Sequence, residues 1–123
     1  PVEYAVKFRH DGRIQSTGQD WEGPYAPSID QVIQHVGDGF GNACGAILFS
    51  GMGNDGAIAA PRLAASGCPV WAQSADTCAV SSQPDSVRET GCVSFNGSPE
   101  QLALQLVERV RRELKNATSL TQP

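Results

Sequence analysis

Polar and apolar residues alternate over the first part of the chain. Residues 2–9 carry apolar side chains at every second position, the pair Asp11-Gly12 follows, and a second short alternating run extends to Thr17. A period of two places one face of a strand against a core, and Asp-Gly favours a two-residue turn. The pattern therefore predicts an antiparallel β-hairpin.

From Ser28 onward the apolar residues recur three and four positions apart, which is the period of one helix face. Ser28 and Gln31 have the spacing of a capping box, and Gly37 interrupts the apolar pattern. We therefore expect a helix that begins after Ser28 and ends at Gly37.

Unbroken apolar runs follow at residues 45–49 and 69–72, as is typical of parallel strands buried on both faces. A glycine-rich turn and a helix lie between them in the predicted order, and a short helix leads to a third strand at residues 92–95. This alternation predicts an α/β fold with a mostly parallel, doubly wound (Rossmann-like) sheet, preceded by the antiparallel hairpin. Ligands of such sheets bind beyond the carboxyl ends of the strands.

The last helix has the clearest sequence pattern. Ser98 and Gln101 form a second capping box, with Pro99 at the first helical position. The polar residues 117–123 are expected to form a flexible tail, so the folded part is assigned to residues 1–116. The apolar face predicted for this helix comprises Ala103, Leu106, Val107, Val110 and Leu114.

The composition is that of a soluble globular chain: 123 residues, a formal net charge of −4 and 40% hydrophobic residues. It does not favour nucleic-acid binding, and no apolar run approaches the roughly 20 residues of a membrane span, so no membrane insertion is expected. The four cysteines have the spacing of no common zinc or redox motif. We expect free thiols in a reducing compartment, the cytoplasm.

A glycine-rich loop follows the strand expected at residues 45–49. Gly51, Gly53 and Gly56 match the G-x-G-x-x-G turn that binds dinucleotides. Asp55, however, would place a carboxylate where such a turn holds a pyrophosphate. From the spacing alone two other interpretations stay open: Asp55 caps the following helix, or it presents a carboxylate for catalysis.

Three segments resemble successive blocks of the protein-glutamate methylesterases of bacterial chemotaxis. They are SIDQVIQ (28–34), GAILFSGMGNDGA (45–57) and VWAQSADTCAVSSQP (70–84), and Ser-Gly-Met-Gly-x-Asp-Gly is their most specific part. That family consists of serine hydrolases on a doubly wound sheet, which demethylate glutamyl esters on chemoreceptors without a metal or organic cofactor. The resemblance implies that Asp55 is the acid of a Ser-His-Asp triad. It also implies that the backbone N–H of Met52 binds the oxyanion, in an active-site loop formed with Gly51, Gly53, Asn54 and Gly56.

By the same resemblance, the nucleophilic serine and the histidine are expected upstream of Pro1. Residues 1–116 would then be the C-terminal portion of a catalytic domain, with a receiver domain further upstream and methyl-accepting chemotaxis receptors as partners. The chain alone is expected to be inactive and, with one face of its sheet uncovered, to self-associate. The alternative is a non-catalytic regulatory or receptor-docking half-domain, and a dinucleotide-binding module is less favoured.

Four further features complete the sequence-based picture. His35 is interpreted as a helix-borne residue rather than the catalytic base, and Ser50 as a local hydrogen-bonding residue rather than a nucleophile. The segment Ser81-Ser82-Gln83 stands where the family has an aromatic residue, a glycine and a methionine, which changes the wall beside the loop. Pro61 removes one hydrogen bond from the helix after the loop and is expected to kink or shorten it.

Overall fold

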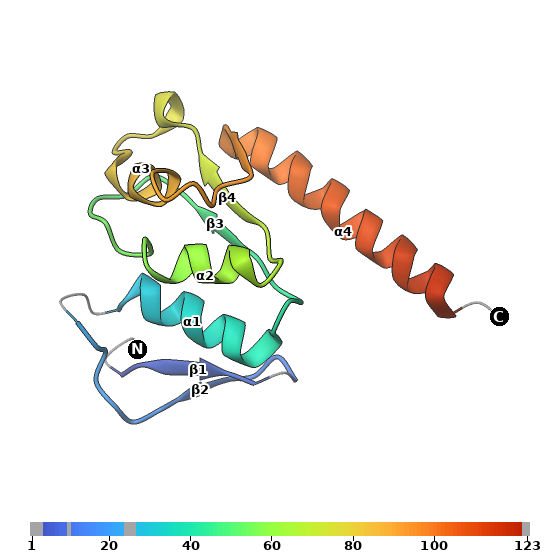
Figure 1. Cartoon of the computed structure of the whole chain (residues 1–123), viewed down its shortest axis with the longest axis horizontal. Coiled ribbons are helices and arrows are strands. Elements are labelled where there is room, and N and C mark those ends of the chain that lie inside the picture. Colours follow the sequence, from blue (N-terminus) through green and yellow to red (C-terminus); the bar gives the residue numbers. More distant parts are fainter. Residues whose placement is uncertain (1–3, 10, 24–26, 122–123) are drawn as a thin grey trace.

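The structure, a computed structural model, describes residues 4–9, 11–23 and 27–121, and side chains as far as residue 116. Within these residues the strands form two sheets (Figure 1). β1 (Val6–Phe8) and β2 (Ile14–Ser16) pair antiparallel, which confirms the predicted hairpin. β3 (Ala46–Leu48), β4 (Val70–Gln73) and β5 (Phe95–Gly97) form a parallel sheet in that order.

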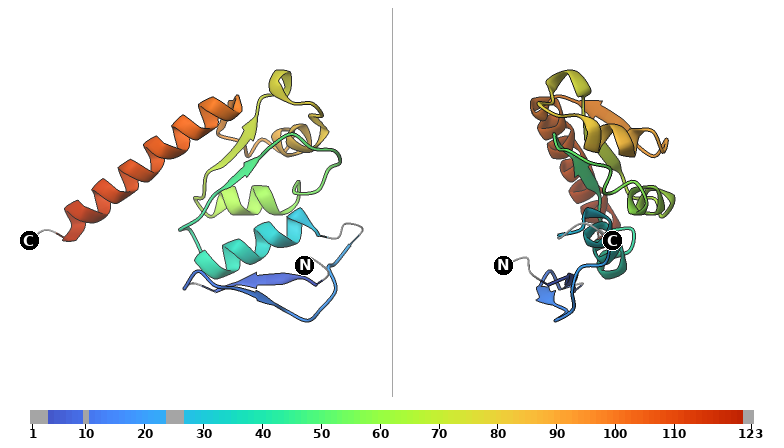
Figure 2. Two further views of the ribbon diagram at one scale, coloured as in Figure 1. Left: turned by 180° about the vertical axis from the view of Figure 1, so that it is seen from behind. Right: turned by 90° about the vertical axis from the view of Figure 1, so that its left-hand side faces the viewer.

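Helices alternate with the parallel strands, so the α/β fold is as predicted. α2 (Ala59–Ala65) connects β3 to β4, and two short helices, η1 (Ala75–Thr77) and α3 (Ser82–Arg88), connect β4 to β5. α1 (Ile29–Phe40) lies between the hairpin and α2 (Figure 1). α4 (Pro99–Thr121) follows β5 and extends away from the other elements (Figure 2).

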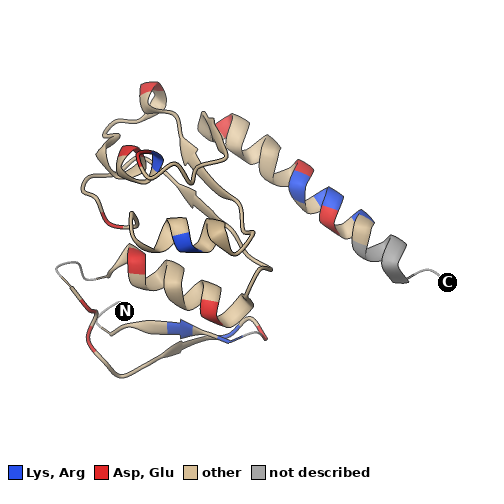
Figure 3. Cartoon of the chain, viewed as in Figure 1, with Lys and Arg blue, Asp and Glu red and all other residues tan. Residues whose placement is uncertain are grey.

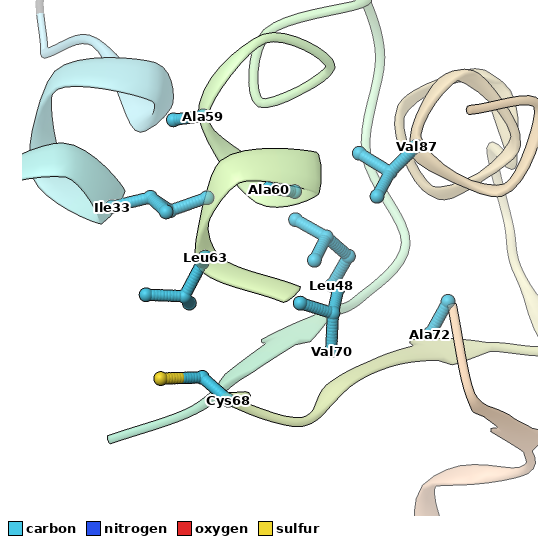
Figure 4. Close-up of a cluster of buried hydrophobic side chains, with 9 residues drawn as sticks. All are labelled: Ile33, Leu48, Ala59, Ala60, Leu63, Cys68, Val70, Ala72 and Val87. Atoms are coloured by element: carbon cyan, nitrogen blue, oxygen red, sulfur yellow. The ribbon is translucent and has the colours of Figure 1, made fainter. Parts of the chain in front are cut away.

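The hydrophobic core lies between one face of the parallel sheet and the helices α1, α2 and α3 (Figure 4). Its most deeply buried members, Ala60, Val70, Ala72 and Val87, are 0% exposed. Removing such apolar surface from water is the main stabilising contribution to a fold of this kind. The cluster comprises Ile33, Leu48, Ala59, Ala60, Leu63, Cys68, Val70, Ala72 and Val87.

The opposite face of the sheet is turned towards α4. Because side chains alternate along a strand, Ile47 and Trp71 point away from the core cluster, and both line a hollow with Leu106 and Val110 of α4. Trp71 also packs edge-to-face on Phe95 of β5, with ring centroids 5.9 Å apart. Helices therefore lie on both faces of the sheet, in agreement with the predicted doubly wound arrangement.

The predicted end of α1 is wrong, since the helix continues past Gly37 to Phe40 and is capped at Gly41. Gly37 serves close packing instead: a Cβ there would lie 3.3 Å from the Leu63 side chain of α2. Gly39 is more restricted, because its Cβ would lie 2.3 Å from the carbonyl oxygen of Phe8 in β1. Both glycines let α1 approach its neighbours rather than end the helix.

Two other boundaries differ from the sequence-based prediction. The third parallel strand runs over Phe95–Gly97 rather than residues 92–95, because Phe95 is the first residue to pair with β4, opposite Trp71. Cys92 and Val93 instead pack against the core. The expected loss of a hydrogen bond at Pro61 is wrong: the regular part of α2 begins at Ala59, so the proline lies in the first turn, where its missing N–H costs no intrahelical hydrogen bond.

The start of α4 agrees with the prediction. Gln101 N–H donates to Ser98 Oγ at 3.2 Å, and Ser98 N–H donates to Gln101 Oε1 at 2.8 Å, which is a complete capping box. The predicted apolar face, however, is largely uncovered among the described residues: Val107 and Val110 are 46% and 48% exposed and Leu114 is 64% exposed. The helix continues to Thr121, beyond the boundary expected at residue 117, and the flexibility of that tail stays a prediction.

The cysteines are free thiols, as expected. Cys44 and Cys68 lie with their Sγ atoms 3.7 Å apart at the amino ends of β3 and β4. Burial, reinforced by the Cys68 thiol, raises the pKa of Cys44 to about 11, so this thiol is protonated at neutral pH and is a poor nucleophile. In the part of the chain that the structure describes, no helix has both the length and the apolar character needed to cross a membrane.

Candidate active site

The glycine-rich loop lies where the sequence places it, between the carboxyl end of β3 and the start of α2 (Figure 1). Two segments flank it: the first turn of α1 bonds to one end, and residues 80–83 at the start of α3 bond along its length. The loop is therefore held by parts of the chain on both sides of it in the sequence.

Asp55 is 5% exposed, and its carboxylate accepts two backbone hydrogen bonds. One oxygen accepts from Ile29 N–H, and the other accepts from Asp30 N–H at 3.0 Å. Both donors belong to the first turn of α1. Asp55 thus caps a helix, but the helix is α1 rather than the following one that the sequence suggested. Both N–H groups stand at the N-terminal, positive end of the α1 dipole.

Asp30, in the first turn of α1, caps α2 in the same way. Its Oδ1 accepts hydrogen bonds from Ile58 N–H at 3.1 Å and Ala59 N–H at 2.8 Å, at the start of α2. The N-termini of α1 and α2 are therefore capped crosswise, each by a carboxylate from the other segment. This crossed pair fixes Asp55 relative to two helices, and Asp30 accepts the hydrogen bonds of the Ile58 and Ala59 N–H groups at the start of α2.

The backbone of the loop is bonded to the start of α3 at alternate residues. Gly51 O accepts from Gln83 N–H at 3.1 Å, Gly53 N–H donates to Ser82 Oγ at 3.1 Å, and Asp55 O accepts from Gln83 Nε2. Gly51 N–H also donates to Val80 O at 2.9 Å. We call these four contacts the loop clamp. Gly53 and Gly56 have φ values of 107° and 102°, in the left-handed region that favours glycine.

The residues between the clamped positions are turned outward. The Met52 side chain is 78% exposed, and Asn54 is also exposed. In a trans peptide the C=O and N–H groups point in opposite directions, so the bond from Gln83 to Gly51 O turns Met52 N–H away from α3. Among the residues that the structure describes, no acceptor is bonded to this N–H.

Ser50 is hydrogen-bonded, as predicted, but to residues 23 and 30 positions away rather than to neighbours in the sequence. Its hydroxyl donates to Val80 O and accepts from Val80 N–H, both at 3.1 Å. Its own N–H donates to the side chain of the buried Gln73 at 2.8 Å, and Gln73 Nε2 donates to Thr77 O at 2.9 Å. Ser50 thereby ties the segments after β3 and β4 together, and its single O–H is already used.

The other candidates lie apart from Asp55. His35 contacts Gln31 and Asp38 of its own helix, with Nδ1 3.9 Å from Asp38 Oδ2, which agrees with its interpretation as a helix-borne residue. His10, which the sequence pattern places at the turn of the hairpin beside Asp11-Gly12, lies outside the described residues. Within the described residues, no group of three or more His, Cys, Asp or Glu side chains is arranged to hold a metal ion.

Asp55 lines a hollow of about 430 Å³. A carboxylate has about four lone-pair sites, and two of those of Asp55 are used by α1, so it can accept a further N–H. A second hollow, of about 470 Å³, lies under α4 near the amino ends of β3 and β4 and is therefore remote from the loop. The first hollow is lined by Glu22, Gly23, Ser28, Asp30, Gln31, Gln34, Asn54, Asp55, Ala57 and Ile58.

Comparisons with known proteins show the family of the chain. The family model described as CheB methylesterase matches residues 1–106. A protein-glutamate methylesterase/protein-glutamine glutaminase 2 of Burkholderia lata is 37% identical over 105 residues, which cover 85% of this chain and 31% of the relative. The corresponding protein 3 of Burkholderia orbicola is 40% identical over 100 residues, which cover 80% and 29%.

The solved structures include a similar fold. The crystal structure of the Thermotoga maritima CheB methylesterase catalytic domain superposes with a TM-score of 0.77 at 21% identity, covering 88% of this chain and 59% of that chain. This chain belongs to the CheB methylesterase family. It spans about a third of the length of the curated relatives that it matches.

Three contributors to the site were missed by the sequence-based reading. Asp30 was treated only as part of a family block, and Ser82 and Gln83 only as departures from a pattern. An acidic residue in the first turn of a helix is a weak signal of capping, but its target on another helix has no local signature. The roles of Ser82 and Gln83 depend on contacts about thirty residues away in the chain.

Proposed function

We propose that the intact protein is a protein-glutamate methylesterase, in which Asp55 is the acid of a Ser-His-Asp triad. The serine and the histidine are supplied by residues outside this sequence. The observation that carries the proposal is the carboxylate of Asp55, held by two N–H groups of α1 at the carboxyl end of β3, with acceptor sites left over and a hollow beside it. A triad acid needs a fixed acceptor of this kind to orient its histidine.

In the proposed reaction the histidine takes the serine proton while its other ring N–H donates to Asp55. The serine oxygen attacks the carbonyl carbon of the glutamyl methyl ester, and the tetrahedral intermediate expels methanol, which receives the proton. Water then attacks the acyl-enzyme, and the glutamate carboxylate is released. No metal ion or organic cofactor takes part.

The backbone N–H of Met52 is the proposed oxyanion donor on this chain. It has no bonded acceptor among the described residues, and the clamp aims it away from α3. A donor whose direction is fixed before the reaction stabilises developing negative charge without reorganising. Gly51, Gly53, Asn54 and Gly56 form the loop that presents it, and Gly53 and Gly56 supply the positive φ values.

The substrate class follows from the family. The relatives from Burkholderia are named for glutamate demethylation and glutamine deamidation of proteins, and we propose methyl-accepting chemotaxis receptors as the partner, in the cytoplasm, with a receiver domain elsewhere in the parent protein. A dinucleotide-binding module is less supported, because the donors at the start of α2, which would face a pyrophosphate, are occupied by Asp30.

The test is methanol release from a methylated receptor, measured with the parent protein and with the 123-residue chain. We expect release by the parent protein and none above background by the chain alone, because a triad acid by itself supplies no nucleophile and the Ser50 hydroxyl is bonded to Val80 O. An inactive parent protein would favour the regulatory or receptor-docking half-domain. Micromolar binding of NAD in a calorimetric titration would favour the dinucleotide module instead.

A further inference from the structure

We infer that Gln83 is a positioning residue of the esterase site, which holds the backbone of the Asp55 loop through its side-chain amide. The inference rests on the proposed function for its consequence in catalysis, but its structural basis does not. Gln83 is 6% exposed, its Nε2 donates to Asp55 O, and its own N–H donates to Gly51 O. One residue therefore bonds both ends of the loop segment between Gly51 and Asp55.

The packing around Gln83 agrees with this role. A Cβ added at Gly51 would lie 3.5 Å from Gln83 Cβ, and a Cβ added at Gly56 would lie 3.6 Å from Gln83 Nε2. The glutamine side chain thus lies against the two glycines that bound the loop. A buried amide is costly unless it is hydrogen-bonded, and the Asp55 carbonyl meets that need only in this loop conformation. Gln83 therefore favours this conformation over others that the glycines allow.

The consequence is a defined direction for both proposed reactive groups. The bond to Asp55 O fixes the backbone of Asp55 from one side, while the two N–H groups of α1 fix its carboxylate from the other. The bond to Gly51 O fixes the peptide that carries Met52 N–H. Ser82 Oγ, which accepts from Gly53 N–H, adds a third attachment between these two.

The variant Gln83→Met restores the residue that the family has here but leaves Ser81 and Ser82 in place. It tests the amide directly, because methionine keeps the unbranched shape and approximate volume but has no N–H donor. In the parent protein, with methylated receptor as substrate, we expect kcat to fall by about tenfold while KM changes by less than about twofold, since a small misplacement of reacting groups acts on the chemical step. The matched control is Gln15→Met on the hairpin, where we expect wild-type kinetics. A Gln83→Met protein that folds and keeps the wild-type kcat would overturn the inference.

The variant Gln83→Glu separates positioning from general destabilisation. An ionised glutamate has no donor for the Asp55 carbonyl, whereas the protonated acid has one O–H. We therefore expect its kcat, as a ratio to the wild type at each pH, to be low at neutral pH and to rise as the pH falls. A ratio that stays constant with pH would contradict a role for the donated hydrogen bond.

A measurement on the 123-residue chain keeps the inference testable if the parent protein proves inactive, which would refute the proposed function instead. We expect Gln83→Met to shift the carbonyl ¹³C resonance of Asp55 and to leave that of Leu48 in β3 unchanged, because only the former carbonyl loses a donor. An unchanged Asp55 resonance in the folded variant would show that Gln83 does not hold the loop, whatever the enzyme does.

Discussion

The proposed active-site loop and α4 differ in how far the rest of the chain contacts them: the backbone of the loop is hydrogen-bonded, whereas the apolar face of α4 is largely exposed. In the loop, backbone groups of Ser50, Gly51, Gly53 and Asp55 all bond to groups from β4, α3 or the segment between them. In α4, the large apolar side chains described between residues 103 and 116 are 45–69% exposed, although the helix has a complete capping box. Charged residues lie among them along its length (Figure 3).

This difference shows what a local sequence pattern can and cannot predict. An amphipathic period and a cap predict that a segment is helical, because both are local, but they do not name the surface that covers its apolar face. A loop without any period is fixed by hydrogen bonds that reach across the chain. In this protein the proposed catalytic loop is therefore supported by the chain itself, while α4 offers an apolar face that the described residues leave open.

The largest expected effect concerns α4. We expect the 123-residue chain to self-associate through the exposed face that contains Val107 and Val110, since contiguous apolar surface of this kind favours association. The double variant Val107→Glu, Val110→Glu should return it to a monomer, as measured by light scattering over a concentration series. The control is Arg111→Glu, a neighbouring exposed position outside the apolar face. A wild-type chain that is strictly monomeric at high concentration would contradict this expectation.

A smaller effect tests the crossed caps. Asp30→Ala removes the acceptor of two N–H groups at the start of α2, and we expect the free energy of unfolding to fall by about 1–2 kcal/mol, the usual cost of a lost N-cap. Asp38→Ala is the control, because Asp38 lies near the C-terminal end of the same helix, where a negative charge is not stabilising. Urea unfolding of both variants gives the comparison, and equal losses would show that Asp30 is an ordinary surface acid.

The smallest expected effect is a pH dependence of stability that arises from Asp85 in α3. Hydrogen bonds from Arg88 and then Ser81 lower the pKa of Asp85 below its usual 3.8. A lowered pKa in the folded state means that the stabilisation is present above the unfolded pKa and is lost as the pH falls through the folded one. We expect Asp85→Asn to reduce slightly the loss of thermal stability between about pH 5 and about pH 2. Identical pH profiles for variant and wild type would show that the hydrogen bonds of Asp85 do not contribute to stability.

Much of the fold and part of the site follow from the sequence. The capping box of α4, the Ser28 cap of α1, the hairpin and the order of strands and helices depend on neighbours within four residues or on a simple period, so they can be predicted from the sequence. The predicted box at α1 is only half formed, because the Gln31 side chain accepts from Glu22 N–H instead of Ser28 N–H. The end of α1 could not be predicted, because Gly37 and Gly39 are required by contacts with Leu63 and Phe8 rather than by the end of the helix. The start of β5 could not be predicted either, because it is set by the pairing of Phe95 with Trp71 of β4.

The proposed site also has features that the sequence predicts and features that it does not. The position of the Asp55 loop at the end of a parallel strand follows from the alternation of elements. The capping of α1 by Asp55 does not, since the two partners are 25 and 26 residues apart and nothing local links them. Gln83 could only be seen as a departure from a family pattern, because its partner lies 28 residues away.

The measurement that tests the central claim most directly is kcat of Asp55→Asn in the parent protein. Asparagine keeps the shape of the side chain and can still cap α1 through one oxygen, but its NH₂ group faces the histidine where an acceptor is needed. In the serine-protease example from which the triad is best known, this change lowers kcat by about 10⁴-fold. We expect a fall on the order of 10²- to 10⁴-fold, measured well below the unfolding temperature, with the fold checked by circular dichroism. A folded variant that loses less than about threefold, short of the tenfold that 1.4 kcal/mol represents, would show that Asp55 only caps α1 and takes no part in catalysis.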